Sequence, residues 1–207
     1  MKLFKLSVAL LVLSLSSTVL AQVERYVAGT HYRELETPIR TADSEKVEVI
    51  ELFWYGCPGC YGFEPHLAAW EDRQTEEIDH KRMPAVWNPI TRIHAQAYYT
   101  AEVLGVLDAV HDPFFDEFHV NRNYLQNEVV IREFFESCGI SQQDFDRVFN
   151  SFAVRTRMNQ GERLMNEYGA PSTPSVYVNG KYVVTLGSAG YQHMIDVVEY
   201  LVSIEQS

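Results

Sequence analysis

Apolar and polar positions alternate along the chain in blocks that predict strands separated by helices. The segment Lys46–Tyr55 is dense in β-branched and aromatic residues and hardly alternates, which is typical of a buried central strand. A helix is predicted next, with one apolar stripe formed by Cys60, Phe63, Leu67 and Trp70. Pro65 lies within this helix and is expected to kink it without ending it. A second strand over Ile78–Val86 would complete a βαβ unit.

The middle of the chain, from about Trp87 to Phe152, has the pattern of short amphipathic helices. Two apolar faces are predicted here, one formed by Val130, Ile131, Phe134 and Phe135 and the other by Phe145, Val148, Phe149 and Phe152. The second face follows a Ser141-x-x-Asp144 capping signal. A longer helix from about Val154 to Tyr168 is expected to end at Gly169.

Strand signals return near the C-terminus. Pro174–Val178 and Lys181–Leu186 flank Asn179-Gly180, a pair typical of a tight hairpin turn. A final amphipathic helix is predicted from Tyr191, Met194, Ile195, Val198, Leu201 and Val202. The order of elements predicts an α/β protein with a mixed sheet, built from residues 22–86 and 154–207, and an all-helical insertion over 87–153.

The first 21 residues have the pattern of a cleaved signal peptide. Lys2 and Lys5 precede an apolar run from Leu3 to Leu15, and Val19-Leu20-Ala21 resembles a small-residue cleavage site. The alternative is an uncleaved membrane anchor, but the run is short and no basic residues follow it to stop transfer. We therefore expect an exported protein in a compartment where disulfides persist.

The net charge and the number of cysteines narrow the possible partners and the source of stability. Without residues 1–21, 15 basic residues face 28 acidic ones, a formal charge of −13, which argues against nucleic acid or anionic membranes as partners. Three cysteines are too few for a disulfide scaffold, so the fold must depend on its apolar core.

The motif Cys57-Pro58-Gly59-Cys60 lies at the junction of the first predicted strand and helix. Cys57 would sit at the helix N-terminus, where free N–H groups and the helix dipole stabilise a thiolate and lower its pKa. Cys60 lies one turn later on the apolar stripe, which makes it the resolving thiol within disulfide reach of Cys57. Pro58 suits the first helical position because it has no N–H to leave unpaired.

Zinc binding and a purely structural disulfide are the other roles open to this pair. A structural zinc site usually has four ligands, and the sequence has no second CxxC motif or closely spaced histidine pair. His66 and Cys138 would complete a poor ligand set. A structural bridge across two residues would restrict the unfolded chain very little. The pattern therefore favours redox chemistry, and no metal or cofactor is expected.

The chain as a whole resembles a known family. The strand FWYG, the CPGC motif, Pro65 and the later Ser172-Thr173-Pro174 resemble the thioredoxin superfamily. The export signal, the helical insertion and the segment VNGKYVV are similar to its DsbA branch, the periplasmic thiol:disulfide oxidoreductases. The resemblance implies a thioredoxin-like fold with a helical insertion. It also implies a periplasmic enzyme that passes its disulfide to exported proteins with free thiols and is reoxidised by a quinone-linked membrane protein of the DsbB type.

The resemblance also implies roles for single residues. Pro174 should follow a cis peptide bond and, with Thr173, contact the active site and the substrate backbone. Glu51 should be a buried acid that relays protons, although the sequence alone favours an exposed glutamate on an edge strand. Lys81 would be its paired lysine, with Arg82 an equal candidate.

Gly59 departs from the pattern of the family, whose commonest dipeptide is Pro-His. Glycine supplies only backbone N–H groups to the thiolate, so we expect a milder oxidant.

A disulfide isomerase or reductase and a chaperone-like binder remain alternative functions. Such isomerases typically add an N-terminal dimerisation domain, and too few residues precede the first strand here for one, so a monomer is expected. Cys138 is expected to be an inert, packed thiol.

Overall fold

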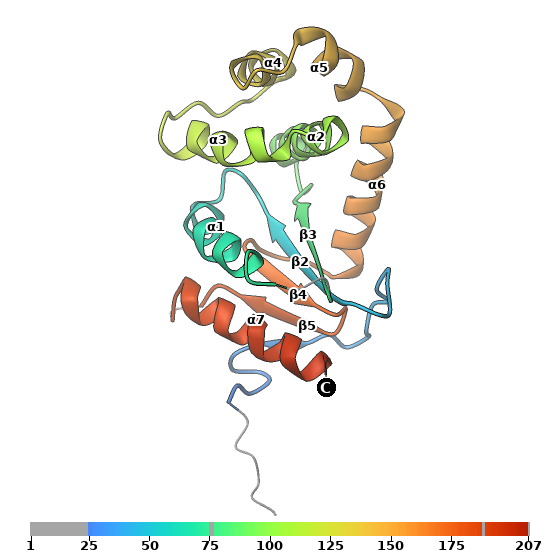
Figure 1. Ribbon diagram of the computed structural model, residues 1–207, viewed down its shortest axis with the longest axis vertical. Coiled ribbons are helices and arrows are strands. Elements are labelled where there is room, and N and C mark those ends of the chain that lie inside the picture. Colours follow the sequence, from blue (N-terminus) through green and yellow to red (C-terminus); the bar gives the residue numbers. More distant parts are fainter. Residues whose placement is uncertain (1–24, 75–76, 188, 207) are drawn as a thin grey trace, which may run out of the picture.

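A five-stranded mixed sheet forms the centre of the protein, with the strand order β1-β5-β4-β2-β3 (Figure 1). The computed structural model describes residues 25–74, 77–187 and 189–206, so the expected signal peptide lies outside the described residues. The strands are β1 (Arg33–Glu34), β2 (Val47–Phe53), β3 (Ile78–Pro84), β4 (Ser175–Val178) and β5 (Tyr182–Thr185). Strand β2 pairs parallel to β3 and antiparallel to β4, and all of its residues are buried, as its continuous apolar run predicts.

Helices cover both faces of this sheet (Figure 1). Helices α1 (Pro58–Glu71) and α7 (Tyr191–Glu205) pack on the face formed by Val49, Val176 and Val184. Helix α6 (Phe152–Glu167) packs on the opposite face, which carries Ile50, Leu52 and Tyr177. Because side chains alternate along a strand, β2 contributes to both apolar layers.

Four further helices lie between β3 and α6 in the chain and sit above one end of the sheet (Figure 1). They are α2 (Pro89–Leu104), α3 (Leu107–His119), α4 (Glu128–Ser137) and α5 (Gln142–Phe149). Their apolar residues belong to the same core cluster as the end of β2. Phe53 and Tyr55, for example, contact Phe115 of α3, with ring centroids 6.0 and 4.9 Å apart. The helical insertion and this face of the sheet therefore share one core.

The hairpin between β4 and β5 turns at Asn179 and Gly180, as the sequence predicts. Both residues have positive φ, 50° and 62°, and the Lys181 N–H donates to the Val178 carbonyl oxygen at 3.0 Å. Val178 pairs with Tyr182, so three residues connect the two strands. The sequence analysis missed β1, because its two exposed residues carry no apolar pattern.

The predicted apolar face that includes Phe152 is wrong in that one residue. Helix α5 begins after Ser141, whose side chain accepts a hydrogen bond from the Asp144 N–H, and it ends at Phe149. Ser151 then caps a new helix, so Phe152 starts α6 and is 79% exposed. Helix α1 continues past Pro65, in agreement with the sequence analysis. Within the described residues, no helix is both long and apolar enough to cross a membrane.

Candidate active site

The two cysteines of the CPGC motif occupy different environments at the start of α1. Cys57 is the N-cap residue of the helix and is half-buried, whereas Cys60 is completely buried one turn later. The Cys57 N–H donates to the Trp54 carbonyl oxygen at 2.9 Å, which turns the chain from β2 into the helix. Pro58 occupies the start of the helix, where an N–H would have no helical partner. Both thiols are free, and only Cys57 is within reach of solvent.

The surroundings of Cys57 favour its thiolate. Its pKa falls from 9.0 to about 5, because the Cys60 thiol, the Thr173 side chain and the backbone N–H groups of Cys60 and Gly59 donate hydrogen bonds to its sulfur. Partial burial opposes this shift without reversing it. The pKa of Cys60 is raised, first by burial and then by its hydrogen bond to Cys57 and the nearby Glu51 carboxylate. The pair therefore consists of an accessible thiolate and a buried thiol.

A loop that is distant in the sequence completes this end of the site. The Thr173–Pro174 peptide bond is cis, and the Cys57 sulfur lies 3.4 Å from the Thr173 carbonyl oxygen. Gly59 faces the same loop. A Cβ at position 59 would lie 3.0 Å from the Pro174 ring and 3.4 Å from Leu186. The structure thus brings together the four motif residues with Thr173 and Pro174.

Glu51 is fully buried on β2, which is a central strand, so the alternative of an exposed glutamate on an edge strand is wrong. Neither of its carboxyl oxygens has a hydrogen-bond partner in the described part of the chain. Its pKa is well above 4.5, because burial disfavours the charged form and the Glu64 carboxylate repels a second negative charge. Burial and the Glu64 carboxylate therefore both favour the protonated form of Glu51.

The pairing of Lys81 with Glu51 is wrong. In the β2–β3 ladder Lys81 lies opposite Ile50, and Arg82 lies opposite Glu51. Since neighbouring residues point to opposite faces, the Lys81 ammonium contacts Glu48 and Asp79, at 2.7 and 2.6 Å. The Arg82 guanidinium, at 3.7 Å from Glu51, is the cation on the face of the cysteines.

Known proteins share this fold and sequence over most of the chain. Residues 66–199 match the DSBA-like thioredoxin domain, a range that begins after Cys60 and so does not depend on the cysteine pair. The chain is 38% identical to the thiol:disulfide interchange protein DsbA of Azotobacter vinelandii over 180 residues, covering 86% of this chain and 84% of the relative. It is 34% identical to the DsbA of Pseudomonas aeruginosa over 188 residues, covering 90% of this chain and 89% of that protein.

The chain belongs to the DsbA family.

Solved structures of the family agree. The crystal structure of Pseudomonas aeruginosa DsbA matches with a TM-score of 0.84 at 34% identity, over 89% of this chain and 96% of that chain. The oxidoreductase DsbA from Xylella fastidiosa matches with a TM-score of 0.81 at 30% identity, over 87% of this chain and 98% of that chain. The predicted fold, a thioredoxin-like domain with a helical insertion, is confirmed. As a DsbA-family protein the chain is a thiol:disulfide oxidoreductase.

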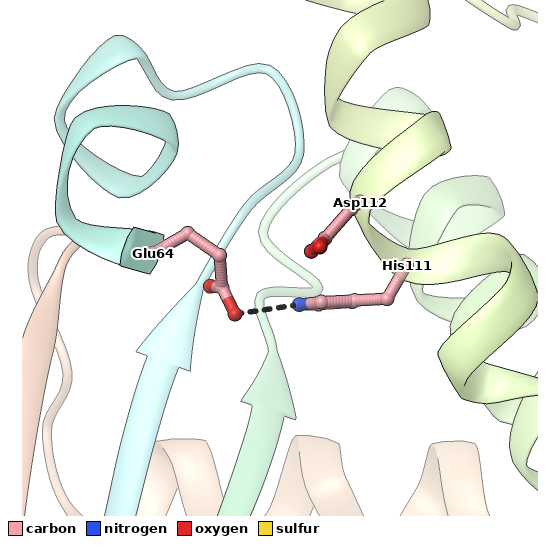
Figure 2. Close-up of side chains that lie close together, drawn as sticks. All are labelled: Glu64, His111 and Asp112. Atoms are coloured by element: carbon pink, nitrogen blue, oxygen red, sulfur yellow. Dashed lines mark ion pairs between the residues drawn. The ribbon is translucent and has the colours of Figure 1, made fainter. Parts of the chain in front are cut away.

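The sequence analysis missed three residues of a buried polar network below the DsbA cysteines. Glu64 of α1 binds Arg82 at 2.7 Å, and His111 of α3 lies 2.9 Å from the Tyr55 hydroxyl. His111 also lies 3.4 Å from Glu64, as Figure 2 shows. Glu64 could have been found, because it lies four residues after Cys60 on the same side of the helix. His111 and Tyr55 carry no such signal, because only the packing of α3 on the end of β2 brings them together.

The absorbance and the stability of the reduced protein should both depend on pH through the ionisation of Cys57. Its pKa in the folded protein, about 5, lies below the ordinary value of 9.0. The thiolate therefore adds stability that is present above pH 9 and is lost as the pH falls through about 5. We expect the ultraviolet absorbance of the thiolate to titrate near pH 5, and the denaturation midpoint of the reduced protein to fall with it.

The matched control for this titration is Cys57→Ser, which keeps Cys60 and Cys138, two thiols whose pKa values are raised by burial. This variant should show no thiolate transition near pH 5. A wild-type transition near pH 9 would mean that the helix N-terminus and the Thr173 loop do not stabilise the thiolate.

Proposed function

We propose that the protein is a disulfide donor of the periplasm, which oxidises exported proteins through a Cys57–Cys60 disulfide. The observation that carries this proposal is the asymmetry of the pair: Cys57 is accessible with a lowered pKa, and Cys60 is buried with a raised one. A low pKa of Cys57 stabilises the reduced form relative to the disulfide, so the protein gives its disulfide away.

The transfer has two steps. A substrate thiolate attacks the Cys57 sulfur, a substrate–Cys57 disulfide forms, and the Cys57–Cys60 bond breaks. A second substrate thiolate then attacks the substrate sulfur of this mixed disulfide and releases Cys57 as a thiolate. Two electrons pass from the substrate to the enzyme. Because Cys60 is buried, attack is confined to Cys57, and the low pKa of Cys57 makes it a good leaving group.

Glu51 supplies the proton that Cys60 needs when it leaves. A buried thiolate is costly, and the negative charge of Glu51 raises the pKa of Cys60 further. A protonated Glu51 avoids this repulsion and offers the proton, and the neighbouring Arg82 accommodates the carboxylate that remains. Glu51 is therefore the proton relay, with Arg82 in place of Lys81.

The surroundings of the pair fit a polypeptide substrate. The Thr173–Pro174 loop lies beside the Cys57 sulfur, where its backbone is placed to align an extended substrate segment. The N-terminal pattern of residues 1–21 supports export. A quinone-linked membrane protein of the DsbB type would reoxidise the pair, and the protein would act as a monomer.

The test is the equilibrium redox potential of the cysteine pair in glutathione buffers. We expect a potential more oxidising than glutathione, because the reduced form is stabilised by the Cys57 thiolate. A value near that of thioredoxin, about −270 mV, would contradict a disulfide donor and favour a reductase.

Gly59→His is expected to raise this potential. An imidazole beside Cys57 would add a hydrogen-bond donor and positive charge for the thiolate, and each pKa unit is worth about 30 mV. Gly59→Ala is the matched control, since it adds the same Cβ contact with Pro174 but no donor. If the alanine variant raised the potential as much as the histidine variant, the cause would be displacement of the Pro174 loop.

A further inference from the structure

A second group of polar side chains converges between α1 and α3, apart from the cysteines. Glu64 comes from α1, and His111 and Asp112 come from α3. One oxygen or nitrogen atom of each lies within 4.8 Å of the other two. Figure 2 shows both carboxylates and the imidazole directed into the same space.

Two of these atoms are buried without a hydrogen-bond partner among the described residues. They are Oε2 of Glu64 and Nε2 of His111, and each of these residues is only 8% exposed. A buried polar atom without a partner is costly, and most such atoms in proteins are bound by a protein group, by water or by an ion. The arrangement therefore offers unused ligand atoms between α1 and α3.

Glu64 and His111 approach each other without forming a short hydrogen bond. Nε2 of His111 lies 3.4 Å from Oε1 of Glu64, which is long for a hydrogen bond. Two ligands of a tetrahedral ion with bonds of about 2.1 Å lie roughly 3.4 Å from each other. The two side chains therefore approach each other at about this spacing, and the oxygen of Glu64 that is left free for an ion is Oε2, because Oε1 is bound to Arg82.

The surroundings give an ion both access and support. A cavity of about 300 Å³ is lined by Glu64, Asp112 and Asp116, and Asp112 is exposed to solvent. Nδ1 of His111 is hydrogen-bonded to the Tyr55 hydroxyl at 2.9 Å, an arrangement that orients the ring as in metal sites.

The charge of the site also favours a cation. Arg82 binds Oε1 of Glu64 at 2.7 Å and leaves Oε2 free. Glu64 and Asp112 together carry two negative charges against the single positive charge of Arg82, and the Asp116 carboxylate adds a further negative charge to the lining of the same cavity.

We propose that Glu64, His111 and Asp112 form a binding site for one divalent transition-metal ion of the Zn²⁺ type, with water completing its coordination. One nitrogen and two oxygen ligands with an open position are within the normal range for this ion. The sequence analysis expected no metal, because it considered only ligand sets that include the CxxC cysteines. These three residues instead come from two helices that are separated in the chain and meet only in the folded protein.

Calorimetric titration of the oxidised protein with ZnCl₂ tests this site. In the oxidised form Cys57 and Cys60 are joined and cannot bind the ion, and Cys138→Ser removes the third thiol. We expect one Zn²⁺ per chain. Asp112→Asn should weaken binding at least ~10-fold, since it removes an exposed ligand without disturbing the buried pairs. Asp116→Asn is the matched control, because it makes the same change of charge in the same cavity outside the ligand set, and it should leave the affinity nearly unchanged.

The ¹⁵N resonance of Nε2 in His111 gives a readout at the site itself, and it should shift when Zn²⁺ is added. Absence of binding would overturn the proposal. Binding that persists unchanged in Asp112→Asn would also overturn the proposal, since the ion would then be held elsewhere, by other histidines. Equal weakening by Asp112→Asn and Asp116→Asn would point to general attraction by the acidic cavity and would also overturn it.

Discussion

Replacing Cys57 with serine is expected to abolish disulfide transfer. A serine hydroxyl cannot form the disulfide that is handed on, and Cys60 is buried too deeply to be attacked in its place. The measurement is the rate at which catalytic amounts of the protein oxidise a reduced, unfolded substrate in a glutathione buffer. The variant should give no rate above the buffer alone.

Two further variants make this result specific. Cys60→Ser should also lose turnover, but it should accumulate mixed disulfides with the substrate, because Cys57 keeps its thiolate and lacks its resolving partner. Cys138→Ser should leave the rate unchanged, since Cys138 packs at the end of α4 with a pKa raised by burial. Turnover by Cys57→Ser, or its loss in Cys138→Ser, would contradict the assignment of the pair. If Cys57→Ser still protected a client from aggregation, a separate binding activity would be present.

Replacing Arg82 with methionine is expected to reduce the free energy of unfolding by about 3–5 kcal/mol. Arg82 is the cation that binds Glu64 at 2.7 Å and Glu71 at 3.2 Å, and it lies 3.7 Å from Glu51. Methionine would fill much of the same space but would leave the Glu64 carboxylate buried without its guanidinium partner. Urea denaturation at neutral pH gives the difference in free energy directly.

Lys81→Met is the matched control, because it removes the neighbouring positive charge from the same strand. The Lys81 side chain is 38% exposed and its partner Glu48 only 8%, so a loss smaller than that of Arg82→Met is expected, because water can reach the lysine end of this pair. A similar loss in both variants would mean that the buried carboxylates are not balanced by Arg82. A loss in Lys81→Met alone would restore Lys81 as the important cation.

The choice between Lys81 and Arg82 illustrates the limit of the sequence analysis. Two adjacent basic residues on a strand differ only in the face to which they point, and that depends on how β3 pairs with β2. The strand itself could be predicted from its own residues, whereas its register could not. Glu51 raised a different difficulty, because the run Val49–Phe53 indicates a buried strand, whereas a single glutamate is more often exposed than buried.

Features that depend on local chemistry could be predicted. The CPGC motif at a strand–helix junction, the Asn179-Gly180 hairpin and the Ser141 cap each follow from a few consecutive residues. His111 could not be predicted, since its role depends on the packing of α3 against Tyr55 and Glu64. Phe152 was misplaced because its apolar character continued a periodic pattern past the point where Ser151 starts a new helix.

The apolar core that the sheet shares with the helical insertion has a consequence for engineering. Phe53 and Tyr55 pack against Phe115, so a shortened chain that joined β3 directly to α6 would leave large aromatic rings in water beside the cysteines. Such a surface favours aggregation. The insertion is therefore not a removable module, and a minimal version of this protein would need a newly designed polar surface at that end of the sheet.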